Sequence, residues 1–342
     1  MILIDTFLFS EPSEKEVLLT KLNLGSDLVS EWVLVENAYT FRGEYKGLFA
    51  EHLIASPEFD PFRSRISVIS LEIAFPKVRP DDSDGDDLTF PSQYAQRDSA
   101  MGHLLRRWSG QPDAWVLISD TDECLDVSTP LKRHRLLRAT RLGSDLLTLD
   151  RRRFWFDFDN RWFAKRSTPL VRMSALAEWV RAGESLGELR GRGILGNSAG
   201  GLNHLLYEYS TCFDISGVYR KYDTVAHVGM LREDIDRALS CNHRPQFRIK
   251  GQQLGLTRDD WLERVKLTER NSPTYVRENF ERLRTGNIPD NYVENRRRLY
   301  PEFFSPLASF KRRSNTLYED LRDAYRTARN RLNGRRFPSL VQ

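Results

Sequence analysis

The sequence predicts an α/β fold with a mixed, mainly parallel sheet that is flanked by helices, and two observations predict it. Apolar runs of strand length alternate with helical patterns in the first 120 residues, an order typical of parallel sheets. Polar and charged residues follow these runs directly, at the strand ends where open α/β sheets bind ligands. The run Trp115–Ile118 is the clearest, because it is continuously apolar, like a strand buried on both faces.

The first half of the chain contains the clearest elements. We expect strands over residues 2–9, 32–36 and 65–70, and helices over residues 13–24, 48–54 and 92–108. Ser13 and Glu16 have the spacing of a capping box, and Gly25 is a typical stop signal. Residues 80–91 are acidic and flanked by prolines. They are similar to a calcium loop, but the glycine comes too early and the final glutamate is missing, so we expect a solvated loop.

The second half is less regular. We expect a basic helix over residues 130–140, strands over 145–150 and 153–159, a glycine-rich loop over 191–201, and mostly helix from 257 onward. The segment FWFDFDNRWF alternates aromatic residues with Asp157 and Asp159. This pattern fits sugar recognition, and it equally fits an amphipathic sheet packed on a core.

Composition indicates a soluble protein of a reducing compartment. The 342 residues include 40% hydrophobic and 29% charged residues, and the apolar runs are all shorter than the roughly 18 residues of a membrane helix. The N-terminus lacks the basic region of a signal peptide, and the three cysteines form no zinc pattern. We therefore expect a cytoplasmic protein without a signal peptide or transmembrane helix.

The end of the chain is basic. Residues 311–336 contain nine Lys and Arg against three Asp and Glu. Within residues 314–332 one apolar stripe follows helical spacing: Leu317, Leu321, Tyr325, Ala328 and Leu332. A helix of this kind docks on its own domain, pairs with a second copy, or lies on an acidic surface such as a membrane, which would make the protein peripheral.

The richest group of polar residues follows the run Trp115–Ile118. Ser119, Asp120, Thr121, Asp122 and Glu123 bring three carboxylates to the end of a buried strand. Such carboxylates repel each other and are tolerated when a hard cation such as Mg²⁺ or Mn²⁺ neutralises them. The pattern indicates a metal-dependent site for a nucleotide or nucleotide sugar. The alternative is a solvated loop that caps the next helix.

Several segments, taken in order over residues 1–304, resemble glycosyltransferase family 17, the β-1,4-mannosyl-glycoprotein N-acetylglucosaminyltransferases. The segments are IDTFLF, WVLVENAYTFRGEYKG, QRDSA, ISDTDE, RKYDTVAH and IPDNYVENRRRLYPEFF. Three positions depart from the family pattern: Cys124-Leu125 after the DxDE, Leu202-Asn203 before His204, and Val228-Gly229 after His227. These departures lie toward the acceptor side, so they put the acceptor in doubt more than the donor.

The resemblance implies one GT-A-type (Rossmann-like) domain over residues 1–304 and an inverting transfer from a nucleotide sugar, UDP-N-acetylglucosamine, to a glycan or other hydroxyl acceptor. It implies Mn²⁺ or Mg²⁺ held by Asp120, Asp122 and His227. The implied donor-binding residues are Glu36, Thr40, Lys46, Arg97, Ser119 and Lys221. A carboxylate must act as the base, and the candidates are Glu123, Asp157, Asp159 and Glu208. Arg97 also fits an ordinary surface arginine, and His227 a structural histidine.

Three other functions remain open. A phosphatase of the haloacid-dehalogenase type also places DxD after a buried strand, but there a small or β-branched pair follows, where this chain has Glu123 and Cys124. A glycosyltransferase with another nucleotide sugar has the same pattern. A non-enzymatic module would bind a polyanion or membrane through the basic tail at residues 305–342. Residues 1–304 give no sign of a nucleic-acid partner.

Overall fold

The computed structural model describes residues 1–78, 85–141, 144–155, 157–158, 160–162, 167–195, 202, 205–224, 246–249, 252–255, 262–264, 266–269, 271–285 and 287. The expected tail helix at residues 314–332 lies outside these residues. So do two of the predicted site residues, Asp159 and His227.

The centre of the fold is a parallel sheet with the strand order β4-β1-β2-β3. Its strands are β1 (Leu3–Phe9), β2 (Glu31–Asn37), β3 (Ile66–Leu71) and β4 (Trp115–Asp120). All of β1 and β2 is buried, and so is β4 up to its last residue, which explains their nearly continuous apolar sequences. Leu8 of β1 lies opposite Asp120, and Phe9 lies opposite Glu36. The carboxyl ends of the three strands therefore meet at one edge.

The strands after β4 add an antiparallel half. β8 (Ser167–Arg172) pairs antiparallel with both β4 and β6 (Leu146–Trp155). β7 (Asn160–Trp162) and β12 (Leu262–Arg264) extend the sheet beyond β6. β9 (Leu206–Ser210) runs parallel to β6 and antiparallel to β5 (Glu123–Leu125), and β10 (Gln246–Ile249) forms a separate ribbon with β11 (Gln252–Gly255). The predicted α/β class with a mixed sheet is confirmed.

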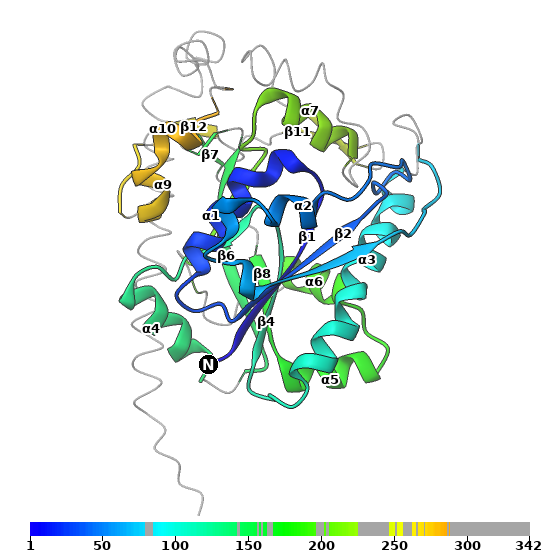
Figure 1. The fold of residues 1–342 in the computed structure, drawn as a ribbon, viewed down its shortest axis with the longest axis vertical. Coiled ribbons are helices and arrows are strands. Elements are labelled where there is room, and N and C mark those ends of the chain that lie inside the picture. Colours follow the sequence, from blue (N-terminus) through cyan, green and yellow to red (C-terminus); the bar gives the residue numbers. More distant parts are fainter. Residues whose placement is uncertain are drawn as a thin grey trace, which may run out of the picture.

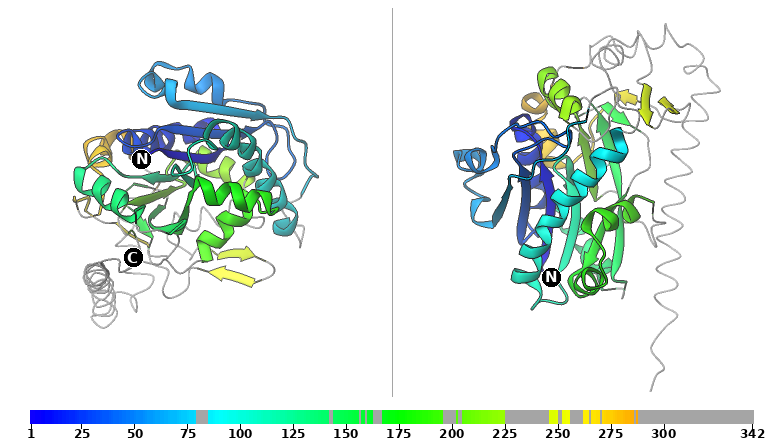
Figure 2. Two further views of the ribbon diagram at one scale, coloured as in Figure 1. Left: turned by 90° about the horizontal axis from the view of Figure 1, so that it is seen from below. Right: turned by 90° about the vertical axis from the view of Figure 1, so that its right-hand side faces the viewer.

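Helices cover both faces of the sheet (Figures 1 and 2). One face packs on α1 (Lys15–Gly25), α2 (Ala50–Ile54) and α4 (Pro130–Ala139), and the other on α3 (Gly85–Trp108), α5 (Met173–Arg181) and α6 (Leu186–Leu195). Alternate residues of one strand enter different cores, as the pleat requires: Trp32 and Leu34 face α1, whereas Val33 and Val35 face α3.

A third core closes the antiparallel half. It contains Phe154, Tyr207 and Tyr209 and packs against α7 (Ile215–Thr224), α9 (Thr274–Glu278) and α10 (Phe280–Leu283). The ring centroids of Phe154 and Tyr209 lie 5.4 Å apart in a stacked arrangement. Of the two interpretations of the aromatic segment, the buried Phe154 and Phe158 therefore follow the amphipathic-sheet interpretation.

Several predicted boundaries are wrong. The first helix begins after a 3-10 turn at Pro12–Glu14, and no side-chain capping hydrogen bond forms at its start, so Ser13 makes no capping box. The two strands expected at residues 145–159 are one strand, β6, up to Trp155. The loop expected from Gly191 begins inside α6, which ends at Leu195.

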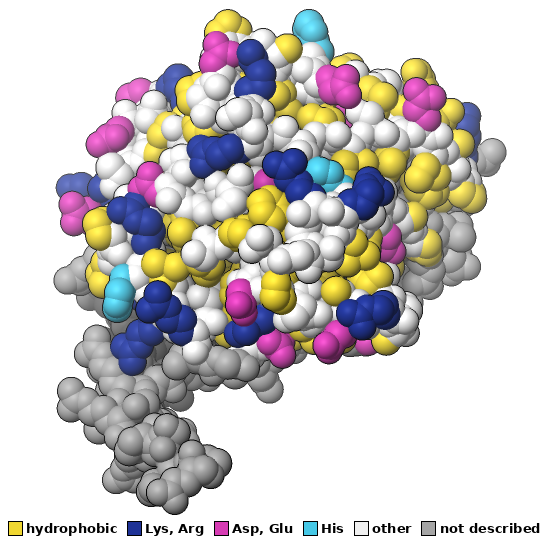
Figure 3. All heavy atoms as spheres, turned by 60° about the horizontal axis from the view of Figure 1, so that its bottom comes forward, with side chains coloured by type: hydrophobic (Ala, Val, Ile, Leu, Met, Phe, Trp, Pro, Cys, Tyr) yellow, Lys and Arg dark blue, Asp and Glu magenta, His cyan; other side chains and the backbone are white. Residues whose placement is uncertain are grey.

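One face of the molecule (Figure 3) bears on the alternative of a nucleic-acid or membrane module. On the face drawn in Figure 3, basic and acidic side chains are interspersed, and they do not form the stripe of one sign that follows a phosphate backbone. None of the described helices combines the length and the apolarity that crossing a bilayer requires.

Candidate functional site

The three carboxylates at and directly after the end of β4 lie at the C-terminal edge of the sheet. β4 ends at Asp120, and a two-residue turn leads into β5 at Glu123. The side chains are exposed to different degrees: 34% for Asp120, 11% for Asp122 and 0% for Glu123. The turn thus leaves Asp120 partly exposed, keeps Asp122 nearly buried and buries the glutamate completely.

Two buried arginines from different helices hold Asp120. Arg97 of α3 bonds to Oδ1, and Arg190 of α6 donates to Oδ2 at 3.0 Å. Each arginine also donates to a carbonyl of β4: Arg97 to Ser119 at 2.7 Å and Arg190 to Ile118 at 3.3 Å. Burial would raise the pKa of Asp120, but the charges of Arg97 and Arg190 outweigh it and hold the pKa well below its usual range.

Glu123 belongs to a buried ion network beneath the site. Its carboxylate pairs with Arg151 and Arg190 and accepts a hydrogen bond from Thr168 Oγ1 at 3.0 Å. Glu208 on β9 joins through Arg151 at 2.9 Å and Arg153 at 2.8 Å. Because Arg151 and Arg153 are two residues apart on β6, they point to the same face.

The two glutamates of this network titrate in opposite directions. Burial is the largest influence on Glu123 and raises its pKa in spite of Arg151 and Arg190. Burial also raises the pKa of Glu208, but Arg153 and Arg151 overcome it and lower the value to about 2. Both side chains are buried and bound by arginines. In this structure Glu123 and Glu208 therefore serve as the acidic partners of Arg151, Arg153 and Arg190 in the buried ion network.

Asp122 is paired with Lys221 of α7. The Lys221 ammonium donates to Asp122 Oδ2 at 2.8 Å and lies 3.7 Å from Glu14 Oε1. Burial would lower the pKa of Lys221, but Asp122 and Glu14 raise it above its ordinary value. Burial raises the pKa of Glu14 to about 7, against the opposing charge of Lys221.

Ser119 lies beneath the aspartates and faces the interior. Its hydroxyl donates to Asp5 Oδ1 at 2.5 Å and accepts from Lys21 Nζ at 2.8 Å. Lys21 also pairs with Asp5 at 2.9 Å and donates to the carbonyl of Glu123 at 2.6 Å. Ser119 therefore supports the turn from below, and a donor contact through its side chain would require this pairing to open.

The loop after β2 brings together the other predicted donor-binding residues. Glu36 accepts hydrogen bonds from the backbone N–H of Phe49 and Ala50, at 2.9 and 2.8 Å, and from Lys46 at 3.1 Å. The Thr40 hydroxyl accepts from the N–H of Glu44 at 3.1 Å inside the same loop. These residues shape the loop and fix the start of α2 beside the site.

One more predicted residue lies in a different place. Asp157 accepts hydrogen bonds from the N–H of Phe158 at 2.9 Å and of Thr285 at 3.3 Å. It lies in the buried region beside the third core. Among the described residues, Asp120, Glu123, Glu208 and Arg97 form one connected group of ion pairs. Asp122 and Lys221 join it through the Ser210 hydroxyl, which lies 3.4 Å from Asp122 Oδ2 and 2.7 Å from Glu208 Oε1. Asp157 is tied instead to backbone amides.

The basic side chains are what the sequence interpretation missed. The expected mutual repulsion of the carboxylates is relieved by Arg97, Arg151, Arg153, Arg190 and Lys221, which come from α3, β6, α6 and α7. The two-residue spacing of Arg151 and Arg153 was the available signal for two of them, but the strands expected at 145–150 and 153–159 left Arg151 between them. Arg190 gave no local signal, because its partners lie about 70 residues away along the chain.

The metal that the resemblance implies can be tested against these side chains. Among the residues that the structure describes, no group of three or more His, Cys, Asp or Glu is arranged to hold a metal ion. Both oxygens of Asp120 are bound by arginines, and Oδ2 of Asp122 is bound by Lys221. Neither carboxylate fits a divalent cation in this arrangement, because the chain's own cations already neutralise both.

Comparisons with known proteins leave the family open. No family model matches the sequence, and no curated protein matches it. Among solved structures, the chain is similar to the galactosyltransferase LgtC, determined in complex with donor and acceptor sugar analogues. The identity is 13%, the TM-score is 0.27, and the match covers 67% of this chain and 81% of LgtC. So weak a likeness carries no argument, and the fold assignment rests on the strand topology described above.

Proposed function

We propose that this chain is a GT-A-type glycosyltransferase that moves a sugar from a nucleotide sugar to a hydroxyl of a glycan or other acceptor. One observation carries the proposal: segments that resemble family 17 in sequence make direct contact in space. Arg97 of QRDSA bonds to Asp120 of ISDTDE, and Lys221 of RKYDTVAH bonds to Asp122, 99 residues away in the chain. These contacts lie at the sheet edge where open α/β folds bind ligands.

The proposed reaction places specific demands on the site. When the sugar leaves, negative charge develops on the nucleotide diphosphate, and a fixed cation nearby stabilises it. Lys221 suits this role, because its side chain is 16% exposed and lies among the motif residues. Arg97 and Arg190 are buried and engaged, so we assign them to positioning Asp120.

The finer assignments follow from the resemblance. We propose UDP-N-acetylglucosamine as the donor, inversion at the anomeric carbon, and a catalytic domain over residues 1–304 with the basic tail appended. Inversion requires a carboxylate that deprotonates the acceptor hydroxyl. The four candidates stay Glu123, Asp157, Asp159 and Glu208. In this structure Glu123 and Glu208 hold arginines and Asp157 accepts backbone amides, whereas Asp159 lies outside the described residues.

A panel of nucleotide sugars tests the proposal. Each would be added to the protein with and without Mn²⁺, and the melting temperature would be measured. A ligand that binds the folded state stabilises it by RT ln(1 + [L]/Kd), so the preferred donor gives the largest shift. We expect UDP and UDP-N-acetylglucosamine to raise the melting temperature more than CMP-sugars or GDP-sugars do. Shifts from none of the nucleotide sugars, and no release of UDP with glycan acceptors, would contradict the proposal.

A further inference from the structure

The second aspartate of the motif has a lysine as its counter-ion. Lys221 Nζ lies 2.8 Å from Asp122 Oδ2, with the two side chains 16% and 11% exposed. From this pairing we infer that the Lys221 ammonium takes the place beside Asp122 that a divalent cation would need. Lys221 thereby keeps divalent cations out of the site while no nucleotide is bound. The inference deepens the proposed function. It rests on that function in one respect only: the proposed substrate supplies the anion, a nucleotide diphosphate, that would draw Lys221 away from Asp122.

Several contacts fix Lys221 in this place. Asp214 caps the start of α7 by accepting from the N–H of Gly217 at 2.6 Å. Gly217 packs so tightly that an added Cβ would lie 2.7 Å from Ser13 Cβ, which ties α7 to the turn after β1. The Lys221 ammonium also lies 5.1 Å from the ring centroid of Phe213. The lysine is therefore presented to Asp122 by a helix whose position is set independently of any ligand.

A cation that approaches Asp122 has to compete with this ammonium. Two like charges on one carboxylate repel strongly at the edge of a protein interior, where charges are screened less than in water. Asp120 offers no alternative, because Arg97 and Arg190 bind its two oxygens. A divalent cation can thus bind only when Lys221 leaves Asp122.

A diphosphate gives Lys221 a second partner. An ammonium pairs with a phosphate oxygen as readily as with a carboxylate, and the Lys221 side chain is long and flexible. When a nucleotide diphosphate enters beside the turn, Lys221 moves from Asp122 to the phosphate and frees the carboxylate. The nucleotide and the cation therefore bind together, and the cation alone binds weakly.

Titration of Mn²⁺ into the nucleotide-free full chain, followed by electron paramagnetic resonance of the free ion, tests the inference. We expect weak binding by the wild type, and binding at least about tenfold tighter by Lys221→Met and Lys221→Gln, which remove the competing charge. Lys221→Arg keeps the charge and should stay as weak as the wild type. Lys15→Met is the matched control, because Lys15 pairs with Glu58 at the surface, and it should change nothing.

Two results would overturn the inference: wild-type affinity for Mn²⁺ within about threefold of both neutral variants, or a gain in the Lys15→Met control of the same size. Lys221→Gln keeps a hydrogen-bond donor, so it covers the case in which Lys221→Met does not fold. A parallel titration of the wild type with UDP present should raise Mn²⁺ affinity at least about tenfold. If UDP neither binds nor changes this affinity, the proposed function fails, whereas the Mn²⁺ gain of the neutral variants still decides the role of Lys221.

Discussion

At the scale of single residues, the site is organised by cations that the sequence motif does not contain. The carboxylates of Asp120, Asp122 and Glu123 lie close together in the sequence and are expected to repel one another. A bound divalent cation was the neutralising group that the sequence predicted. In the structure, arginines from α3, β6 and α6 perform this neutralisation, and Lys221 completes it. The carboxylates were predictable because they are adjacent in the sequence. Their partners were not, because a pairing over tens of residues depends on the tertiary fold.

Glu14 predicts a pH-dependent stability. Burial raises its pKa from 4.5 to about 7. Between these values the folded chain binds more protons than the unfolded chain, so the stabilisation is fully present below pH 4.5 and is lost as pH rises through 7. Glu14→Gln keeps the neutral shape at every pH. It should be more stable than the wild type at pH 8, on the order of 3 kcal/mol, and equal to it near pH 4.5.

Urea unfolding at pH 5 and pH 8 measures this difference for Glu14→Gln and for the control Glu16→Gln, whose glutamate is partly exposed in the first turn of α1. The control should show little change between the two pH values. An identical pH dependence of wild type and Glu14→Gln would show that Glu14 titrates normally in the fold.

At the scale of elements, strands that are buried on both faces were predictable and the antiparallel half was not. β1, β2 and β4 are nearly continuous apolar runs, which local sequence reveals. β8 and β9 include Pro169 and Glu208, whose burial depends on partners in other segments. The start of α1 was also not predictable from local sequence. There the side chain of Glu14, and not that of Ser13, accepts a hydrogen bond from a backbone N–H, which belongs to Ser10.

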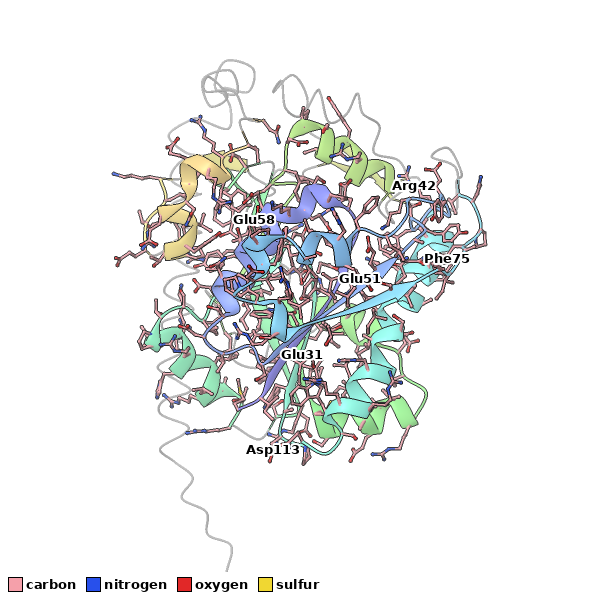
Figure 4. The ribbon with its side chains drawn as sticks, in the orientation of Figure 1. Glu31, Arg42, Glu51, Glu58, Phe75 and Asp113 are labelled. Atoms are coloured by element: carbon pink, nitrogen blue, oxygen red, sulfur yellow. The ribbon has the colours of Figure 1, made fainter. Side chains whose placement is uncertain are left out.

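The loop between β2 and α2 gives a prediction at this scale. Gly43 has φ +79°, and a Cβ there would lie 2.4 Å from the carbonyl oxygen of Phe75. Figure 4 labels Phe75 and the neighbouring Arg42 beyond the ends of β2 and β3, away from Glu31 and Asp113 at the opposite edge. Gly43→Ala should force this loop away from the segment after β3, reduce stability by about 1–3 kcal/mol and weaken UDP binding.

Gly47→Ala is the matched control for this loop. Gly47 has φ +84°, a strain similar to that of Gly43, but the nearest atom to an added Cβ is 3.8 Å away. Urea unfolding of both variants should show the larger loss for Gly43→Ala, because only that variant adds a clash. Equal losses would mean that backbone strain alone sets the effect and that contact with Phe75 is unimportant.

At the scale of the whole molecule, a parallel half and an antiparallel half meet at β4 and β5. The predicted donor-binding residues up to Ser119 lie on the parallel half, whereas Glu208 and the arginines Arg151 and Arg153 lie on the antiparallel half. The turn between Asp120 and Glu123 joins the two. In open α/β sheets ligands bind outside the carboxyl ends of the strands, so the proposed nucleotide site lies where the two halves meet.

The basic tail at residues 305–342 lies outside the described residues, and its charge gives a prediction for the whole molecule. Its charge, nine Lys and Arg against three Asp and Glu over residues 311–336, predicts binding to anionic surfaces. Truncation after Pro306 should abolish co-sedimentation with liposomes that contain anionic lipid, while UDP-sugar hydrolysis stays unchanged. Insolubility of the truncated chain would show instead that the tail packs on the catalytic domain.

Calorimetric titration of UDP in the presence of Mn²⁺ tests most directly the claim that the edge beyond β4 is a nucleotide-diphosphate site. The wild type and Lys15→Met should bind UDP with the same affinity. Lys221→Met should bind it at least about tenfold more weakly, because a charge-assisted contact with phosphate is lost. Equal UDP affinity of all three proteins, or no binding by the wild type, would contradict the claim.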